Sequence, residues 1–442
     1  MSEALDKIRV APGQLPVEGE ESAYWDSQFA IRQVTYDALV LDARLRQSLA
    51  VVRSLGRRGL RVAAVGSSGG LPTFTSRWCQ QAFICPADEG TEAYFHYLEQ
   101  LLDHSGACVL ITSSDATLAL IRRYRKQVEQ RTRVALAREP ALGIAINKER
   151  TLEAAKKLGI SIPRVVNVKV VSEVAEALRE IGLPAVIKPS ESWAWDKQHG
   201  MRLASKLVTT PEEAWHVVEE LEGFGITMLF QQFISGRRES ISLFYASGQI
   251  YASYAQRHMR IVGGESALRE SIAVPPDIGG QAERLVREIE LEGCAEVEFR
   301  RDDAGNPYLM EINPRLWAST ELAVRSRVDF PYLLYQWASG EKIDTVKSYP
   351  VGGRLRYLKG DILNVATSLS TSRQQGIPER DVTPPARAIL DFCLSFFSPV
   401  GYDCLDWKDP LPALTSIVDF VREVLRWAGK ILRKKGNITS NV

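Results

Sequence analysis

Residues 295–315 read AEVEFRRDDAGNPYLMEINPR, in which two alternating apolar segments flank a polar turn. Turn residues between two such segments predict an antiparallel β-hairpin. With the turn at residues 303–306, Glu298 on the first strand lies directly opposite Glu311 on the second. Because side chains alternate between the faces of a strand, Asn313 shares the face of these two glutamates. The hairpin therefore gathers carboxylate and amide oxygens on one face.

Two carboxylates opposite each other on neighbouring strands repel, so this pairing requires compensation. A divalent cation supplies it, because Glu298, Glu311 and Asn313 offer the hard oxygen ligands of a Mg²⁺ site, which Mn²⁺ could also occupy. Phosphate and water oxygens would complete the coordination. Arg315 adds a permanent cation where developing phosphoryl charge needs one. The alternative interpretation is that both glutamates are solvated on an exposed sheet face.

The composition is that of an ordinary globular protein. The chain has 442 residues and a formal net charge of +1, whereas a domain that binds nucleic acid through its phosphates carries a clear basic excess. The six cysteines form no CxxC pair and are expected to be reduced thiols. No apolar run reaches the length of a membrane span and the N-terminus has no secretory signal, so we expect a cytoplasmic protein without a transmembrane segment.

The apolar pattern divides the chain into five segments. Residues 1–35 are polar and are expected to form a loosely ordered extension. Residues 36–146 alternate strand and helix patterns at the size of βαβ units, which predicts an α/β domain with a parallel sheet. Residues 147–228 have the pattern of a small α+β unit, and residues 229–341 that of a region of alternating strands. Residues 342–442 form a C-terminal extension that ends in an amphipathic helix.

Glu298 and the run Glu311-Ile312-Asn313-Pro314-Arg315 resemble the magnesium motif of the ATP-grasp superfamily of carboxylate-amine ligases. By overall similarity the chain resembles the carbamoyl-phosphate-synthase-like and D-aspartate-ligase-like branch, over about residues 38–340. The resemblance implies an ATP-grasp fold of combined α/β and α+β class. In such a fold, residues 36–146 are the pre-ATP-grasp domain. Residues 147–341 are the ATP-grasp domain, which comprises a small lid subdomain and an antiparallel, metal-binding sheet.

The resemblance also implies a set of ATP-binding residues, which occur here in the superfamily's order. Lysines of the two matching segments would contact the nucleotide phosphates, a hinge strand would hold adenine through its main chain, and an acid would bind the ribose. These residues are Lys148, Lys188, Gln231, Ile234 and Glu239. Taken without the family, Lys148 is a surface lysine of a helix, Lys188 a paired structural lysine, and Glu239 a surface acid paired with Arg237.

The loop after Lys188 departs from the family pattern. Many members have a glycine-rich loop whose amides close over the phosphates. Here residues 190–200 contain only Gly200. Side chains such as Ser192 or Lys197, or the two tryptophans of this loop, could close the site instead.

Three arginines are the expected catalytic residues, because they could steer a substrate carboxylate or an acyl phosphate. They are Arg257 and Arg260, which precede the glycine pair 263–264, and Arg315. A solvated basic hairpin is the alternative for the first two. His258 could act as a general base, but a lone histidine is more often a hydrogen-bonded or surface residue.

The function that this resemblance implies is ATP-dependent ligation of a small-molecule carboxylate to an amine through an acyl phosphate, with release of ADP and phosphate. The alternative is an ATP-binding sensor, or a module that recruits a partner through the C-terminal helix without ligase turnover. Attachment to a membrane surface through the basic stretch Arg426 to Lys435 is a third interpretation. A homodimer is compatible with the sequence, and a nucleic-acid partner is not expected.

Overall fold

Five parallel strands form the sheet of the N-terminal domain in the computed structural model, which describes residues 35–196, 199–262, 264–369 and 383–424. The strands, in sheet order, are β3 (Gln81–Ile84), β2 (Val62–Gly66), β1 (Ala38–Val40), β4 (Val109–Ile111) and β5 (Arg133–Val134). The helices are α2 (Arg46–Gly56), α3 (Glu92–Ser105), α4 (Asp115–Arg123) and α5 (Arg125–Glu129). The parallel sheet expected for this part of the chain is confirmed.

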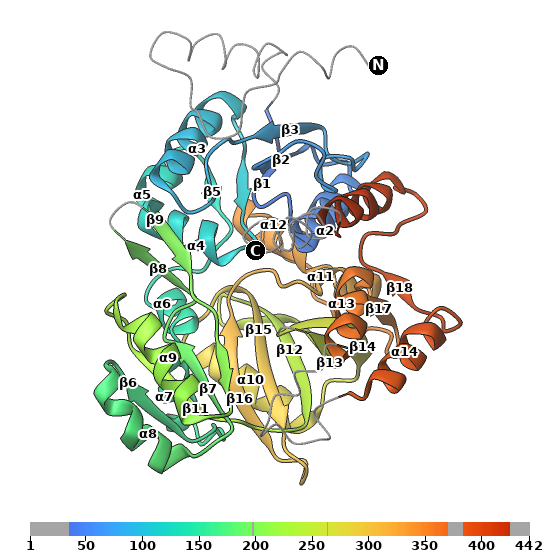
Figure 1. Ribbon diagram of the computed structural model, residues 1–442. Helices are drawn as coiled ribbons and strands as arrows, with labels where there is room; N and C mark the ends of the chain where they lie inside the picture. The colour runs from blue at the N-terminus through green and yellow to red at the C-terminus, as the bar shows by residue number, and fades with distance from the viewer. Residues whose placement is uncertain (1–34, 197–198, 263, 370–382, 425–442) are drawn as a thin grey trace, which may run out of the picture.

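Helices cover both faces of this sheet (Figure 1). Leu39 and Ala63 pack in one apolar core with side chains of α3 and α4, whereas Val40 and Ala64 pack in a second core with side chains of α2. Successive strand residues point to opposite faces, so a sheet buried on both sides requires continuous apolar runs. That is why β1 and β2 contain almost only alanine and valine.

A four-stranded sheet follows the two helices α6 (Ala141–Ile146) and α7 (Lys148–Lys157). Its strands, in sheet order, are β10 (Lys206–Val208), β7 (Ala185–Pro189), β11 (Met228–Gln232) and β6 (Val165–Val168). The short helix η1 (Val171–Glu173), α8 (Val174–Ile181) and α9 (Pro211–Glu222) complete this subdomain, with α8 and α9 in its apolar core. A separate hairpin of β8 (Trp193–Asp196) and β9 (His199–Arg202) extends from it toward α4 (Figure 1). We call residues 158–232, which follow α7, the lid. Because β11 belongs to its sheet, the boundary lies one strand later than the expected 228.

The third sheet has seven strands and includes the C-terminal extension. In sheet order they are β16 (Pro307–Asn313), β15 (Gly293–Arg301), β12 (Arg237–Ala246), β13 (Gln249–Val262), β14 (Glu265–Ile272), β17 (Arg354–Arg356) and β18 (Gly401–Tyr402). The associated helices are α10 (Pro276–Glu288), α11 (Thr320–Arg325), α12 (Phe330–Ser339), α13 (Leu358–Leu369) and α14 (Pro385–Leu394). Residues beyond 341 therefore complete the large sheet at its far edge.

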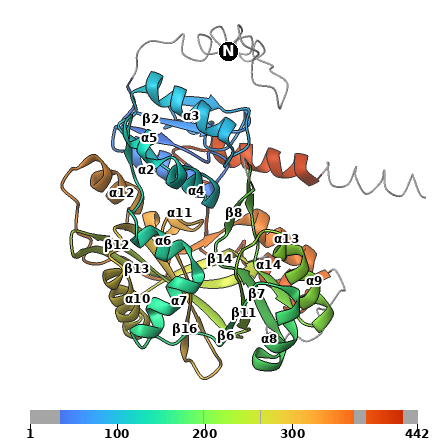
Figure 2. The ribbon, with the colours of Figure 1, turned by 90° about the vertical axis from the view of Figure 1, so that its left-hand side faces the viewer.

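The last described element is a helix over residues 411–424, which we call the C-terminal helix. It lies beside α2 in Figure 1, at the red end of the colour scale, and Figure 2 shows it projecting sideways from the molecule. No described helix is both long enough and apolar enough to cross a membrane. The expected N-terminal extension, except residue 35, lies outside the described residues, as do Lys197 and the stretch Arg426 to Lys435.

Candidate active site

The β15–β16 hairpin places the two glutamates where the sequence predicts. Glu298 pairs with Glu311 in the antiparallel register, and Glu296 pairs with Asn313. The Asn313 side-chain amide donates to Glu298 at 3.2 Å and to Glu296 at 3.4 Å, so these side chains share one face. A β-bulge after Glu298 shifts the remaining pairs by one residue toward the turn. The expected register is thus confirmed at the two glutamates and wrong nearer the turn. The bulge could not be predicted there, because it does not change the alternation of apolar and polar residues.

Cations from three other elements compensate the carboxylates of this face. Arg238, on the neighbouring strand β12, forms an ion pair with Glu298. Burial alone would disfavour the ionised form of Glu311, but Lys148, Lys188 and Arg238 outweigh it and lower its pKa. At Glu296, burial together with the adjacent Glu298 outweighs the opposing effect of Arg238 and Arg315 and raises the pKa to about 8. The ionised form of Glu311 therefore depends in part on positive charge brought by the lid and by α7.

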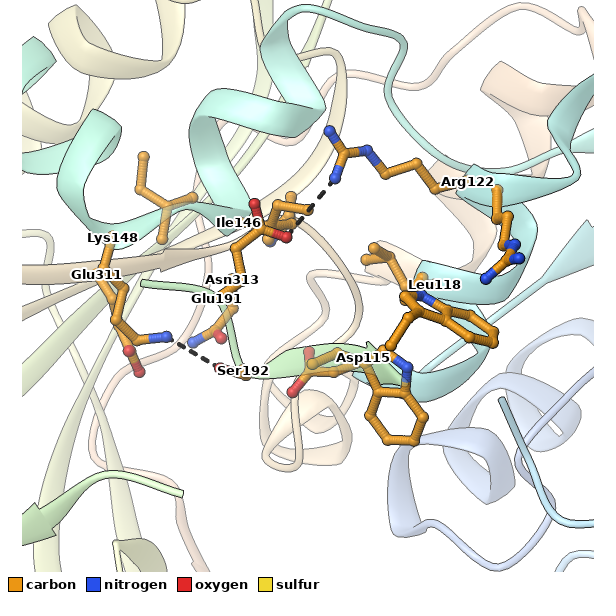
Figure 3. A pocket seen from close by; sticks show the side chains of 15 residues that line it. Asp115, Leu118, Arg122, Ile146, Lys148, Glu191, Ser192, Glu311 and Asn313 are labelled. Atoms are coloured by element: carbon orange, nitrogen blue, oxygen red, sulfur yellow. Dashed lines mark hydrogen bonds and ion pairs between the residues drawn. The ribbon is translucent and has the colours of Figure 1, made fainter. Parts of the chain in front are cut away.

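Lys148 lies at the first position of α7, where Asn147 caps the helix by accepting the amide of Arg150 at 3.1 Å. Its side chain is 6% exposed and donates to the Ser192 hydroxyl at 2.9 Å. The Lys148 amide also donates to the Ser190 carbonyl at 2.8 Å, so the loop of the lid is held directly against α7. Figure 3 shows Lys148 beside Glu311, with the bond to Ser192 drawn.

Lys188 comes from the inner face of the lid sheet. Its neighbour Ile187 and the facing Phe230 lie in the core beneath α8 and α9, so Lys188 and its partner Leu229 point away from that core. Burial lowers the pKa of Lys188, while Glu311 and Glu298 oppose this shift. The structure thus brings the two predicted lysines and the predicted glutamates together, although they belong to three different elements.

Gln231 and Ile234 lie where the lid sheet meets the large sheet. The Gln231 side chain is buried, donates to the Met310 sulfur at 3.6 Å, and has an oxygen without a hydrogen-bond partner among the described residues. The Ile234 carbonyl accepts from Arg300 at 2.7 Å. A buried acceptor without a donor is costly, so the Gln231 oxygen is suited to receive an N–H group from a ligand.

Glu239 lies on the other face of the large sheet. It pairs in register with Phe299, which packs in the core with side chains of α10, whereas the adjacent Ser240 pairs with Glu298. Glu239 is 3% exposed and accepts from Arg301 at 2.7 Å and from Arg257 at 3.4 Å. A nucleotide at Glu298 and Glu311 therefore lies across the sheet from Glu239, so this placement does not support the expected ribose contact. The alternation of β12 decides this, because one residue changes the face.

The three predicted catalytic arginines are separated by the fold. Arg315 pairs with Asp115 of α4 at 2.6 Å, beside the metal hairpin. Arg257 contacts Glu239 on the far face, and Arg260 donates to Asp361 at 2.6 Å and to Ser395 of the C-terminal extension. Only Arg315 therefore lies at the hairpin end that carries Asn313. The sequence suggested one shared site for the three arginines, because it does not show that Glu239 and Asp361, from other segments, pair with Arg257 and Arg260.

A cavity of about 330 Å³ lies between α4, the lid loop and the metal hairpin. Glu311, Asn313 and Lys148 form one side, and Figure 3 shows Arg122 and Asp115 of α4 across from them. The remaining polar and aromatic lining includes Arg123, Glu191, Trp193 and Trp195. Arg123 lies over the Trp195 ring, 4.6 Å from its centroid.

The sequence analysis did not select Asp115 or Arg122 as site residues, although Ser113-Ser114-Asp115 has the pattern of a helix start. Asp115 is mostly buried, which by itself would raise its pKa, but Arg315 overcomes this effect and lowers it. The Arg122 guanidinium lies 3.7 Å from the Glu191 carboxylate of the lid. These contacts make α4 a wall of the same cavity that the metal hairpin lines.

The donor set fits a hard divalent cation. Within the described residues no cluster of three or more His, Cys, Asp or Glu side chains could hold a metal ion by itself. Glu298, Glu311 and Asn313 instead offer two carboxylates and one amide, which is typical of Mg²⁺ bound together with nucleotide phosphates. The ion pair of Arg238 with Glu298 shows that this position already attracts a positive group.

Comparison with known proteins identifies related sequences and folds. Residues 226–360 match the family model described as ATP-grasp in the biosynthetic pathway with Ter operon. The chain is 28% identical over 145 residues to a D-alanine–D-alanine ligase of Francisella tularensis, covering 30% of this chain and 46% of that one. It is 26% identical over 186 residues to D-alanine–D-alanine ligase B of Chromobacterium violaceum, covering 39% and 58%. The chain thus spans about half the length of these curated relatives.

Solved structures share the fold at low sequence identity. Biotin carboxylase of Campylobacter jejuni aligns with a TM-score of 0.60 at 14% identity, covering 72% of this chain and 74% of that one. N5-carboxyaminoimidazole synthetase of Staphylococcus aureus, complexed with ADP, aligns at 0.56 and 14%, covering 73% and 82%. An L-amino acid ligase of Bacillus licheniformis aligns at 0.54 and 17%, covering 71% and 77%. The expected ATP-grasp fold is confirmed, while the finer branch within the superfamily stays a prediction.

Proposed function

We propose that this chain, which belongs to the ATP-grasp superfamily, is an ATP-dependent ligase that joins a carboxylate to an amine through an acyl phosphate. The observation that carries the proposal is the meeting of Glu298, Glu311 and Asn313 with Lys148 and Lys188. An acidic pair facing one buried and one half-buried lysine suits a cation and a polyphosphate, because each group compensates the charge of the next.

The nucleotide lies between the lid and the large sheet in this proposal. Lys148 and Lys188 bind the phosphates, and the Gln231 oxygen accepts from the adenine amino group. Glu298, Glu311 and Asn313 would hold Mg²⁺, which neutralises phosphate charge when it is bound. The Ile234 carbonyl already accepts from Arg300, so adenine would contact Ile234 through its amide or through the second lone pair of the carbonyl.

The chemical steps need positioning and charge stabilisation rather than a nucleophilic side chain. A substrate carboxylate oxygen attacks the γ-phosphorus of ATP, the bond from that phosphorus to the β–γ bridging oxygen breaks, and ADP leaves. The amine nitrogen then attacks the acyl carbon, phosphate leaves, and the amine loses a proton. Arg315, fixed by Asp115, lies at the end of the hairpin where it can stabilise the phosphoryl group in transfer.

The cavity between α4 and the metal hairpin is the substrate site in this proposal. It presents cations, Arg122 and Arg123, together with acids, Asp115 and Glu191. A lining with both signs suits a substrate that carries an amino and a carboxylate group. Amino acids are therefore the first substrates to test, and the similar proteins include a D-alanine–D-alanine ligase and an L-amino acid ligase.

The test is a screen for ADP and phosphate release with pairs of carboxylates and amines, starting with pairs of amino acids. The ligase proposal expects release that requires both members of a pair, with a product whose mass equals their sum minus water. A chain that binds ATP but releases no ADP with any pair would instead be the sensor or recruiting module. A homodimer and a cytoplasmic location stay predictions.

A further inference from the structure

The C-terminal helix packs with its polar side toward the molecule. Thr415 donates to the Thr75 hydroxyl at 3.1 Å, Ser416 contacts Cys404, and Glu423 pairs with Lys359 of α13. Ser416 and Glu423 are seven residues, or about two turns, apart, and Thr415 is adjacent to Ser416, so the three residues lie within an arc of about 100° on one side of the helix. Pro412 and Phe420, on the same side, are buried and half-buried, so the helix is held by hydrogen bonds, one ion pair and limited apolar packing.

Its apolar side faces solvent instead. Five aliphatic side chains at helical spacing are 45–57% exposed: Leu414, Ile417, Val418, Val421 and Val424. Trp407, in the segment just before the helix, is 86% exposed. An amphipathic helix of a globular protein normally buries its apolar stripe. Here the stripe is turned outward, which is the orientation of a helix that docks on something else.

The sequence after the described part of the helix has a strongly basic composition. Residues 425–442 contain five basic side chains, Arg426, Lys430, Arg433, Lys434 and Lys435, and no acidic one. They also contain Trp427. An outward apolar stripe followed by basic residues and a tryptophan is the combination that anionic lipid surfaces attract.

We propose that the C-terminal helix binds an anionic membrane surface by laying its outward apolar stripe into the lipid headgroup region. Figure 2 shows the helix projecting from the side of the molecule, so its far end can reach a flat surface. Lipid chains cover the stripe from Leu414 to Val424, while the basic residues that follow attract anionic headgroups. The proposal does not rest on the ligase activity, because the helix lies outside the candidate active site.

The experiment is flotation of the full chain with phosphatidylcholine vesicles that contain about 30 mol % phosphatidylglycerol, compared with pure phosphatidylcholine vesicles. We expect the chain to float with the anionic vesicles and at least about tenfold less with the neutral ones. The double variant Ile417→Asp/Val421→Asp should lose at least about tenfold in binding, because it places two charges in the stripe. Arg426→Glu/Lys430→Glu should weaken binding to anionic vesicles only.

The matched control is Val351→Asp, which makes the same change at a residue of similar exposure, 56%, outside the helix. It should float as the unmodified chain does. Because Ile417, Val421 and Val351 are exposed, the variants that replace them should keep their circular dichroism spectrum and their ATP-induced thermal shift. Absent flotation with anionic vesicles, or equal flotation of the Ile417→Asp/Val421→Asp variant, overturns the proposal. A dimer in light scattering that this variant dissociates, without flotation of the unmodified chain, assigns the stripe to a second copy and also overturns it.

Discussion

On one face of the seven-stranded sheet, Glu298 and Glu311 meet two lysines from other elements, whereas on the opposite face Glu239 lies between Arg301 and Arg257 beside α10. Both faces therefore contain buried acids compensated by cations. The two faces differ in which elements supply the compensating cations. Glu239 has arginines of its own sheet, whereas the cations at Glu311 include lysines of α7 and of the lid. We therefore expect a structural role for Glu239, whose cations all belong to its own sheet, and expect Glu311, which also faces lysines from outside the sheet, to be available to a ligand.

The largest effect is expected from Glu311→Ala. Loss of this carboxylate should lower the rate of ADP release about 1,000-fold, because a ligand that positions transition-state charge is removed. The fold should persist, since the hairpin keeps its main-chain pairing. Turnover is measured with the active substrate pair, and folding by circular dichroism. Glu212→Ala, at an exposed glutamate of α9, is the control and should leave turnover unchanged. Near-normal turnover of Glu311→Ala would reject the metal assignment.

The opposite face can be tested with Glu239→Gln. The amide keeps the shape but loses the charge opposite Arg301, so the free energy of unfolding should fall by about 1–3 kcal/mol. The affinity for ATP, measured by calorimetry, should stay within about twofold, since Glu239 points away from the lid. Glu270→Gln is a matched control, because its partner Arg354 is 42% exposed and such pairs contribute about 0–1 kcal/mol. Unchanged stability with a large loss of ATP affinity would restore the ribose role of Glu239.

An effect of similar size but limited to high pH concerns Glu89, a mostly buried acid that has little compensation. Burial, with the nearby Asp42, raises its pKa from 4.5 to about 7, and the partner Arg44 is largely exposed. The folded state thus holds this proton more tightly than the unfolded state. The stabilisation is complete below about pH 4.5 and is lost as the pH rises through about 7.

Glu89→Gln cannot lose a proton, so this pH-dependent loss should disappear. At pH 8 the variant should be more stable than the unmodified chain by about 1–3 kcal/mol, and the difference should vanish toward pH 4.5. Urea denaturation at several pH values measures this, with Glu212→Gln as the control. A difference that does not change with pH would show that Glu89 is already ionised in the folded state. In that case Glu89 and Glu311 would no longer differ in their protonation state in the folded protein.

Much of the candidate site could be predicted from local pattern. The alternation of residues 295–315 predicts the hairpin and the opposition of Glu298 and Glu311, because a strand period and a turn together define a register. The bulge after Glu298 could not be predicted, since it adds one residue without disturbing the apolar pattern. The role expected for Glu239 failed to gain support for a related reason. A family motif predicts the order of the functional residues along the chain. It does not predict the face of the sheet to which a side chain points, because that changes with each residue of a strand.

The sequence by itself determined the types of secondary structure, the parallel and antiparallel sheets, and the acidic hairpin, because these depend on spacing between near neighbours. Only the tertiary structure decided which cations meet which acids. Lys148 meets Ser192, Arg315 meets Asp115 and Arg260 meets Asp361, over separations of 44, 200 and 101 residues. It also decided that the C-terminal helix turns its apolar side outward, since amphipathic spacing defines two faces of a helix but not which one packs against the molecule.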